Sequence, residues 1–427
     1  MRRPRLAVLA GTAALALALT GCGGGSDGGG GGTGPAELRG TGPITLVTGK
    51  DTSGNMQKQV DTWNADHPGE KVTIIELPES ADAQRQQMVQ NAQAKSDAYT
   101  VLNLDVIWTA EFAANGWIEQ LNPADFPLDK MLAPTVDTGT YFNRQYAIPI
   151  YSDGGLLYYR KDLLDAAGVQ APKTWAELQS ACRTVQATSK GIGCYAGQFD
   201  KYEGLTVNFS EAVNSSGGSI LKDGKPDVDT PEARKGLDFL ANGFTQGYIP
   251  RAAVTYKEEE SRRAFQDGKL LFLRNWPYVY AKAVAKDGSS RVAGKFAVAP
   301  LPGLTGPGQS TLGGHNYGIS TFAKNKKSAL GFVQFMASEE RQRANLLATS
   351  QAPTWAGLYD EPGLVKQFPY LPILRESIVK AEKRPEAVQY NDVSVAIQSA
   401  AYSTLTGQKT SAQALKDLQA QLQTLIK

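Results

Sequence analysis

Apolar runs alternate with amphipathic stretches along the first part of the chain. Three runs have the length and apolar content of buried strands: 44–48, 72–77 and 101–108. Between the first two, Met56, Val60 and Trp63 recur at helical spacing, and a polar helix is expected over 82–94 before the third. Strands that alternate with helices predict an α/β fold with a parallel sheet and helical crossovers.

The stretch from Ala147 to Leu164 divides this pattern. A short apolar strand at 147–151 is followed by Asp153, two glycines and a second strand-like run at 156–159. A pair of glycines between two such runs permits backbone angles that other residues avoid. We expect the chain to pass from one body to another here, with Asp153 at the seam. The simpler alternative is a strand pair with a tight turn and a surface aspartate.

A second α/β series follows this seam. Thr174 and Glu177 have the spacing of a capping box, and Pro231 is typical of the first turn of a helix. Further strands are expected at 192–195, 270–273, 296–300 and 312–319, and the tail is expected to be helical. Because 427 residues are too many for a single core, two domains are the expected arrangement.

The N-terminus has the pattern of an export signal. Basic residues at 2–5 precede an apolar stretch at 6–19 that is short for a bilayer-spanning helix. Leu-Thr-Gly-Cys, ending at Cys22, resembles a bacterial lipobox, in which the cysteine thiol is joined to diacylglycerol. We therefore expect a lipoprotein signal peptide at 1–21, then a lipidated Cys22 with a Gly-rich linker to residue 41. A plain secretory signal with a chance cysteine is the alternative.

Charge and composition exclude several classes of protein. The formal net charge is +2, and it becomes −1 when the three arginines of the expected signal peptide are removed. This leaves no basic field for nucleic acid. With only His67, His315 and three cysteines, few metal ligands are present, and we expect no metal and no cofactor. Cys182 and Cys194 are twelve residues apart in an exported chain, which favours a disulfide over two buried thiols.

Aromatic residues stand beside polar residues at several expected loop positions. The pairs are Tyr151 with Asp153, Tyr202 with Glu203, and Trp276 with Asn275. A pyranose has an apolar face that stacks on an aromatic ring and a rim of hydroxyls that require polar partners. These pairs therefore suit a sugar, although a core aromatic beside a surface acid is the simpler reading of each pair alone. Two of the acids Asp105, Asp153 and Glu203 would also suit a secreted glycoside hydrolase.

Several segments in this order resemble an extracellular solute-binding protein (family 1) of an ATP-driven sugar importer, and within that family the trehalose/maltose-binding branch. The segments are LDVIWTAEFAANGWIEQL (104–121), PIYSDGGLLYYRKDLL (149–164), KYEGL (201–205), RNWPY (274–278), VAPLPG (298–303), LGG (312–314) and KRP (383–385). The resemblance implies a two-lobed, maltose-binding-protein-like (type II) α/β fold whose lobes close on a disaccharide. It implies three crossings between the lobes, near 152–155, 297–300 and 319–323. Lobe 1 would comprise 42–152 and 298–320, and lobe 2 would comprise 153–297 and 321–427.

The same resemblance implies a set of ligand contacts. They are Asp105, Tyr151, Asp153, Tyr202, Glu203, Trp276, Gly313, Gly314 and Arg384, with weaker matches at Ser80, Arg85, Asp51 and Asn55. Relatives can carry Trp after the two glycines, where this chain has His315. The expected function is that of a non-enzymatic, monomeric receptor on the outer face of the cell membrane. It would capture an α-linked disaccharide, most simply trehalose, and deliver it to the membrane permease, with maltose or another α-glucoside as the alternative.

Overall fold

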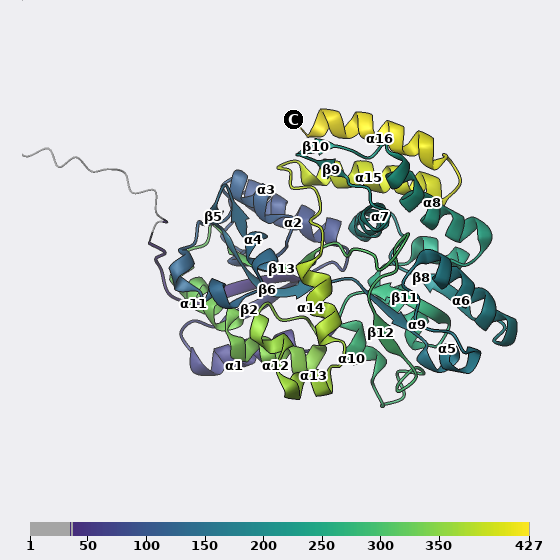
Figure 1. Cartoon of the computed structure of the whole chain (residues 1–427). Coiled ribbons are helices and arrows are strands. Elements are labelled where there is room, and N and C mark those ends of the chain that lie inside the picture. Colours follow the sequence, from purple (N-terminus) through teal and green to yellow (C-terminus); the bar gives the residue numbers. More distant parts are fainter. Residues whose placement is uncertain (1–34, 36, 427) are drawn as a thin grey trace, which may run out of the picture. The chain divides into compact units, whose positions relative to one another are not determined.

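The computed structural model describes residues 35 and 37–426 (Figure 1). The expected signal peptide, Cys22 and most of the Gly-rich linker lie outside the described residues. Within the described residues, no helix has both the length and the apolar character needed to cross a bilayer.

Lobe 1 is built on a five-stranded sheet with the order β2-β1-β3-β13-β6. Its strands are β1 (Ile44–Gly49), β2 (Val72–Leu77), β3 (Val101–Asp105), β6 (Ala147–Asp153) and β13 (Gly313–Ile319). The first three strands are parallel, as the alternation of strands and helices predicted, and β13 runs antiparallel to β3 and β6. The helices of this part of the chain are α1 (Met56–Asp66), α2 (Ala81–Gln93), α3 (Thr109–Ala114) and α4 (Ala133–Asp137).

Lobe 2 is built on a four-stranded sheet with the order β12-β7-β11-β8. Its strands are β7 (Leu156–Tyr159), β8 (Gly193–Ala196), β11 (Leu270–Asn275) and β12 (Ala297–Ala299). The helices between these strands are α5 (Lys161–Ala167), α6 (Trp175–Thr188), α7 (Glu203–Ser215), α8 (Pro231–Gln246), α9 (Glu258–Gln266) and α10 (Val279–Ala283). The apolar run 270–273 is buried, as predicted, and β11 continues through Arg274 and Asn275, which are also buried.

The chain after β13 is helical. It forms α11 (Lys326–Ala337), α12 (Glu339–Thr349), α13 (Pro362–Gln367), α14 (Leu371–Val379), α15 (Tyr390–Leu405) and α16 (Ser411–Leu425). Two small hairpins lie outside the sheets, β4–β5 (Thr140–Tyr141 and Arg144–Gln145) and β9–β10 (Leu221–Lys222 and Lys225–Pro226). In Figure 1 the yellow helices α15 and α16 lie together beside α7 and α8.

Local signals in the sequence explain several element boundaries. The Thr174 hydroxyl accepts a hydrogen bond from the Glu177 amide (3.2 Å), and the Glu177 carboxylate accepts one from the Thr174 amide (3.0 Å). This is the predicted capping box of α6. Pro231 occupies the first turn of α8, as expected. The predicted strand 101–108 ends earlier, at Asp105, because the chain turns there and the Val106 amide donates to the carbonyl oxygen of Gly314 on β13 (3.2 Å).

The crossings between the two sheets differ in part from the expected ones. The first lies at the glycine pair Gly154–Gly155, between β6 and β7, as predicted. The second was expected at 297–300, but β12 belongs to the lobe 2 sheet, so the chain crosses between β12 and β13.

The third crossing was expected at 319–323, and that expectation is wrong. Helix α11 packs its apolar face, including Phe332 and Met336, into the core beneath β1, β6 and β13. Because this face needs the five-stranded sheet to cover it, α11 stays with lobe 1, and the assignment of all of 321–427 to lobe 2 does not hold for α11.

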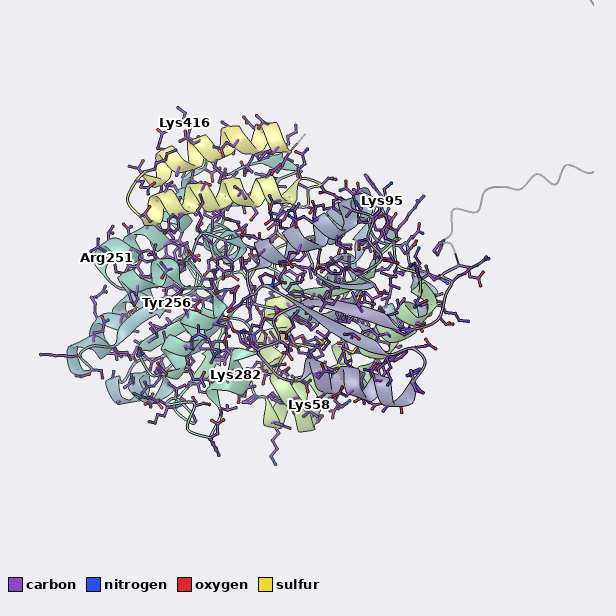
Figure 2. The ribbon with its side chains drawn as sticks, turned by 180° about the vertical axis from the view of Figure 1, so that it is seen from behind. Lys58, Lys95, Arg251, Tyr256, Lys282 and Lys416 are labelled. Atoms are coloured by element: carbon purple, nitrogen blue, oxygen red, sulfur yellow. A yellow bond between two sulfur atoms is a disulfide. The ribbon has the colours of Figure 1, made fainter. Side chains whose placement is uncertain are left out.

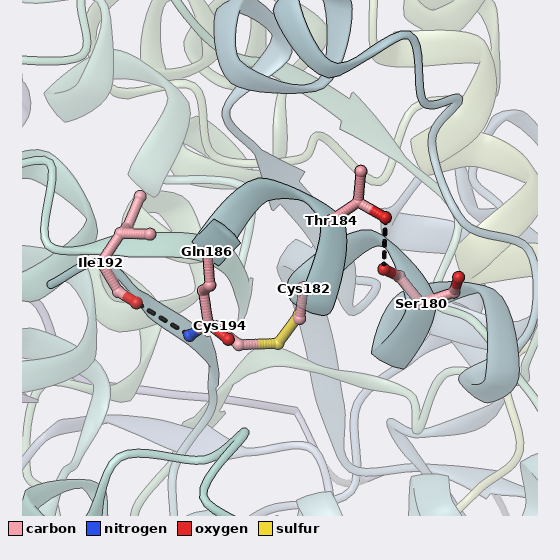
Figure 3. The surroundings of a disulfide bond; sticks show 6 residues. All are labelled: Ser180, Cys182, Thr184, Gln186, Ile192 and Cys194. Carbon is pink, nitrogen blue, oxygen red and sulfur yellow. Dashed lines mark hydrogen bonds between the residues drawn. A yellow bond between two sulfur atoms is a disulfide. The ribbon is translucent and has the colours of Figure 1, made fainter. Parts of the chain in front are cut away.

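The predicted disulfide between Cys182 and Cys194 is present, with a Cα–Cα distance of 5.4 Å. Figure 3 shows that it joins α6 to β8, beside a hydrogen bond from the Gln186 side chain to the Ile192 carbonyl oxygen (2.9 Å). Both cysteines are buried, so the bond ties a core helix to a core strand.

We predict that replacing both cysteines with alanine lowers the free energy of unfolding by about 3 kcal/mol. The reason is that the cross-link no longer restricts the short loop in the unfolded chain. Urea denaturation of the variant and the wild type measures the difference. Mass measurement after alkylation is the control, and two alkylated thiols in the unreduced, denatured wild type would contradict the prediction.

Candidate functional site

A cavity of about 220 Å³ lies where strands of both sheets end. Asp105 is the last residue of β3, Asp153 is the last residue of β6, and Trp276 follows β11. Gly313 and Gly314 begin β13, which runs in the opposite direction to β3 and β6. Nine of the thirteen expected ligand residues line it: Asp105, Tyr151, Asp153, Tyr202, Glu203, Trp276, Gly313, Gly314 and Arg384. These residues are far apart in the sequence, and the two-sheet topology brings them to one place.

The other four expected residues do not line this cavity. Asp51 lines a second cavity, of about 190 Å³, which shares Tyr151 and His315 with the first. Asn55 donates a hydrogen bond to the Asn345 side chain (2.9 Å). Arg85 forms an ion pair with Glu111, and Ser80 stands immediately before α2. Their side chains therefore have structural roles or lie at the edge of the cleft.

Arg384 joins the two lobes by an ion-pair bridge that is almost completely buried. Its guanidinium donates to Asp105 Oδ1 through Nη2 (2.5 Å) and to Glu203 Oε1 through Nη1 (2.7 Å). Asp105 ends β3 in lobe 1, whereas Glu203 begins α7 in lobe 2. Sequence reasoning expected Arg384 to donate to the ligand, but most of its fork is already occupied by these two carboxylates.

The bridge continues into α15. Glu203 also accepts hydrogen bonds from the Ser394 hydroxyl (2.6 Å) and from the Tyr390 hydroxyl. Burial raises the pKa of Glu203, and the charge of Arg384 opposes that rise. Burial acts to lower the pKa of Arg384, but the nearby Asp105, Tyr390 and Glu203 outweigh it and hold that pKa well above its usual value. Arg384 therefore stays charged.

A second contact between the lobes lies at the edge of the cleft. Lys282 on α10, labelled in Figure 2, donates to the carbonyl oxygen of Thr52 in the loop after β1 (2.8 Å). Like the Arg384 bridge, this bond needs the lobes to be close together.

Asp153 is a carboxylate in the cleft whose oxygens have no partner among the described residues. Its side chain makes no hydrogen bond to any residue that the structure describes, and it is only partly buried. Burial raises the pKa of Asp153 well above its usual range; Arg274 opposes this, and repulsion by Asp105 and Glu258 adds to it. Because it has no partner among the described residues, the Asp153 side chain is free to hydrogen-bond a ligand hydroxyl.

Trp276 presents a fixed aromatic surface in the cleft. The Arg274 guanidinium lies 3.8 Å from its ring centroid and is itself held by Glu211 through two hydrogen bonds (2.7 and 2.6 Å). A Cβ atom at Gly313 would lie 3.1 Å from the indole ring and 3.2 Å from Asp153 Cβ. Glycine therefore allows β13 to approach both groups closely.

Glycine is needed at position 314 for its backbone conformation as well as for space. Its φ of +116° lies in a region that other residues avoid, and a Cβ there would be 2.5 Å from the Tyr151 carbonyl oxygen. It stands just before the irregularity in the pairing of β13 with β6 that follows His315. The His315 ring stacks on Tyr151, with ring centroids 5.0 Å apart. A stacked pair therefore occupies the position where relatives can carry Trp.

Sequence reasoning missed several lining residues, among them Glu258, Tyr278 and Gln84. Glu258 accepts a hydrogen bond from the Tyr202 hydroxyl (2.6 Å), and burial raises its pKa. It lies in the run KEEES (257–261), which is typical of the exposed start of a helix. The sequence therefore does not identify Glu258 as a residue of the cleft. Tyr278 could have been found, because it belongs to the RNWPY segment together with Trp276.

Residues 49–343 match the family model of the bacterial extracellular solute-binding proteins. The chain belongs to this family. It is 34% identical to a probable ABC transporter-binding protein of Deinococcus radiodurans over 89% of this chain and 93% of that one. It is also 25% identical to a mannitol-binding protein of Pseudomonas aeruginosa, over 71% of each chain.

The fold is the two-lobed one of this family. The maltose-bound MalE3 of Thermotoga maritima superimposes with a TM-score of 0.85, at 35% identity, over 90% of this chain and 99% of that one. The solute-binding protein is therefore the extracytoplasmic, sugar-binding component of an ABC transporter and works with a membrane permease. These relatives bind solutes and are not enzymes, which argues against the glycoside hydrolase alternative.

We predict that Arg384→Met lowers the free energy of unfolding by about 3–5 kcal/mol at pH 7, because Asp105 and Glu203 lose their shared cation. Without Arg384 the pKa of Glu203 rises further above its usual 4.5. When the pKa of Glu203 is higher in the folded state than in the unfolded chain, its protonation stabilises the fold at a pH below the unfolded-state pKa. This stabilisation is lost as the pH rises through the folded-state pKa. The deficit should therefore shrink between pH 7 and pH 4.

Thermal unfolding across this pH range measures the effect. Arg375→Met is the matched control, because Arg375 forms an exposed ion pair with Asp360 (3.1 Å) that is worth little. An Arg384→Met variant as stable as the control at pH 7 would contradict the prediction.

Proposed function

We propose that this solute-binding protein captures an α-linked disaccharide, most simply trehalose, and that it is held at the outer face of the membrane by a lipid on Cys22. The supporting observation is the cleft itself, where Trp276 offers a ring for an apolar sugar face beside the unpaired acceptor Asp153. Maltose or another α-glucoside is the alternative ligand. The similar MalE3 was solved with maltose bound, which supports a glucoside of this size.

Each lining group has a defined part in this proposal. Asp153 accepts from sugar hydroxyls, and the remaining lone pairs of Asp105 and Glu203 do the same from within the Arg384 bridge. Trp276 supports one ring, while Tyr151 and Tyr202 line it. The main-chain amides of Gly313 and Gly314 approach the ligand without side chains in the way.

The neighbouring 190 Å³ cavity supports a two-ring ligand. It continues from the first cavity past Tyr151 and His315 toward Asp51. One ring would rest on Trp276 and the other would lie beside the Tyr151–His315 pair. The lobes would close on the sugar as a hinge pair whose equilibrium the ligand shifts. Closure would form the Arg384 bridge and the bond from Lys282 to Thr52.

We predict that Trp276→Ala and Asp153→Ala each weaken the binding of trehalose by about ten- to a hundredfold. Losing Asp153 leaves ligand hydroxyls unpaired, at about 1.5–3 kcal/mol, and losing the indole removes a comparable apolar contact. Calorimetric titration of a panel containing trehalose, maltose and mannitol measures the affinities. Melting curves without sugar serve as the folding control for each variant.

Asp129→Ala is the matched control for this experiment. Asp129 is exposed, pairs with Lys130 on the surface and lies outside both cavities, so this variant should bind with nearly wild-type affinity. Unchanged affinity in both cleft variants would remove the ligand from the place proposed here. Binding of none of the three sugars by the wild type would end the disaccharide proposal.

We also predict that Cys22→Ala releases the protein into the medium, because the variant has no thiol to carry the lipid that holds the chain on the membrane. Fractionation of cells that express the full chain, with detection in the membrane and the medium, tests this. Asp27→Ala, in the linker a few residues on, is the control and should stay with the membrane. A Cys22→Ala variant that remains membrane-bound with unchanged processing would show the anchor to be wrong.

A further inference from the structure

The β4–β5 hairpin of lobe 1 carries the most exposed large apolar side chain of the described residues. Phe142, at its tip, is 82% exposed, whereas the other exposed large apolar side chains range from 37% to 48%. A single exposed apolar residue needs no special explanation. The backbone that carries Phe142, however, is also unusual.

Phe142 and Asn143 form the two-residue turn between Tyr141 and Arg144, which pair across the hairpin. Both have left-handed backbone angles, with φ of +46° and +58°. Such turns favour Asn, Asp or Gly at both positions, and a bulky side chain with this φ is strained. Asn143 fits the rule and Phe142 does not, so the hairpin holds a strained residue with its aromatic ring in solvent.

Two tyrosines, Tyr141 and Tyr146, support the Phe142 ring, and we call them the tyrosine stem. The Tyr141 ring packs against Phe142 with centroids 4.5 Å apart, and Tyr146 lies behind Tyr141 at 6.4 Å. Both tyrosines pack in turn against the lobe 1 core around Trp108 and Phe112. The stem holds Phe142 outward.

The hairpin also stands at the seam between the lobes. Thr140, at its base, lines the same small cavity as Lys383, Arg384 and Glu386, the segment that carries the Arg384 bridge. Two residues beyond Glu386, Val388 is 45% exposed. Exposed apolar side chains are therefore carried both by the hairpin and by the segment that follows Arg384.

We propose that Phe142 is a docking residue for the membrane permease and inserts into an apolar pocket on the permease's extracytoplasmic surface. The inference rests on the importer role of the family and not on the identity of the sugar. A contact this small is too limited for a stable dimer, which buries about 800 Å² per partner. It suits a partner that binds and releases in each transport cycle, and one aromatic anchor can supply much of the energy of such a contact. Its place at the seam lets the permease distinguish closed from open lobes.

Phe142→Asn tests the proposal, because Asn suits this turn position. The variant should melt about 1–2 °C higher than the wild type and bind the sugar with unchanged affinity. Uptake in cells that carry the variant as their sole copy should nevertheless fall about tenfold, with the sugar of the calorimetric panel that the wild type binds. Leu347→Asn, 46% exposed on α12, is the matched control and should import normally. Wild-type uptake by Phe142→Asn would overturn the proposal.

A photo-cross-linking measurement does not depend on the sugar. Phe142 replaced by p-benzoylphenylalanine in the full chain should form a light-dependent adduct with a permease subunit, identified by mass spectrometry, whereas the same group at Leu347 should not. If no sugar binds in calorimetry, the disaccharide proposal is refuted, and the cross-linking measurement still tests whether Phe142 contacts the permease. An adduct only to lipid, only to a second copy of the chain, or to no partner would overturn the docking role.

Discussion

The buried bridge from Asp105 through Arg384 to Glu203 is the interaction on which the arrangement of the cleft depends. A charge removed from water is costly unless it is paired and hydrogen-bonded, and here one guanidinium satisfies two carboxylates from different lobes. The bridge therefore ties the end of β3 to the start of α7. It sets the distance between the surfaces that face a ligand.

The bridge also distinguishes the three carboxylates of the cleft by their hydrogen-bond partners. Asp105 and Glu203 are compensated within the protein, whereas Asp153 has no hydrogen-bond partner among the described residues. A neutral, hydroxyl-rich ligand can satisfy Asp153 without disturbing the bridge. In the function proposed here, Asp105 and Glu203 both hold the lobes together and offer their remaining lone pairs to the ligand. Asp153, which lines the same cavity, would serve the ligand alone.

The β4–β5 hairpin connects the region of the Arg384 bridge to the surface of the molecule. The segment 383–386 carries Arg384, and Thr140 of the Phe142 hairpin lines the same small cavity as this segment. In our proposal, a change at the Arg384 bridge would therefore reach an exposed edge of the molecule. A strained residue is retained only where the surrounding structure holds it in place, and the tyrosine stem does so for Phe142.

The sequence by itself determined the features that depend on local chemistry. The strand and helix alternation predicted the parallel start of the lobe 1 sheet, Thr174 and Glu177 predicted a cap, and the glycine pair after Asp153 marked the first crossing. Nine lining residues were named because their segments resemble a known family. Only the tertiary structure decided the rest. The place of α11, the partners of Arg384 and the exposure of Glu258 to the cleft depend on contacts between residues far apart in the chain. Such contacts leave no periodic signal in the sequence.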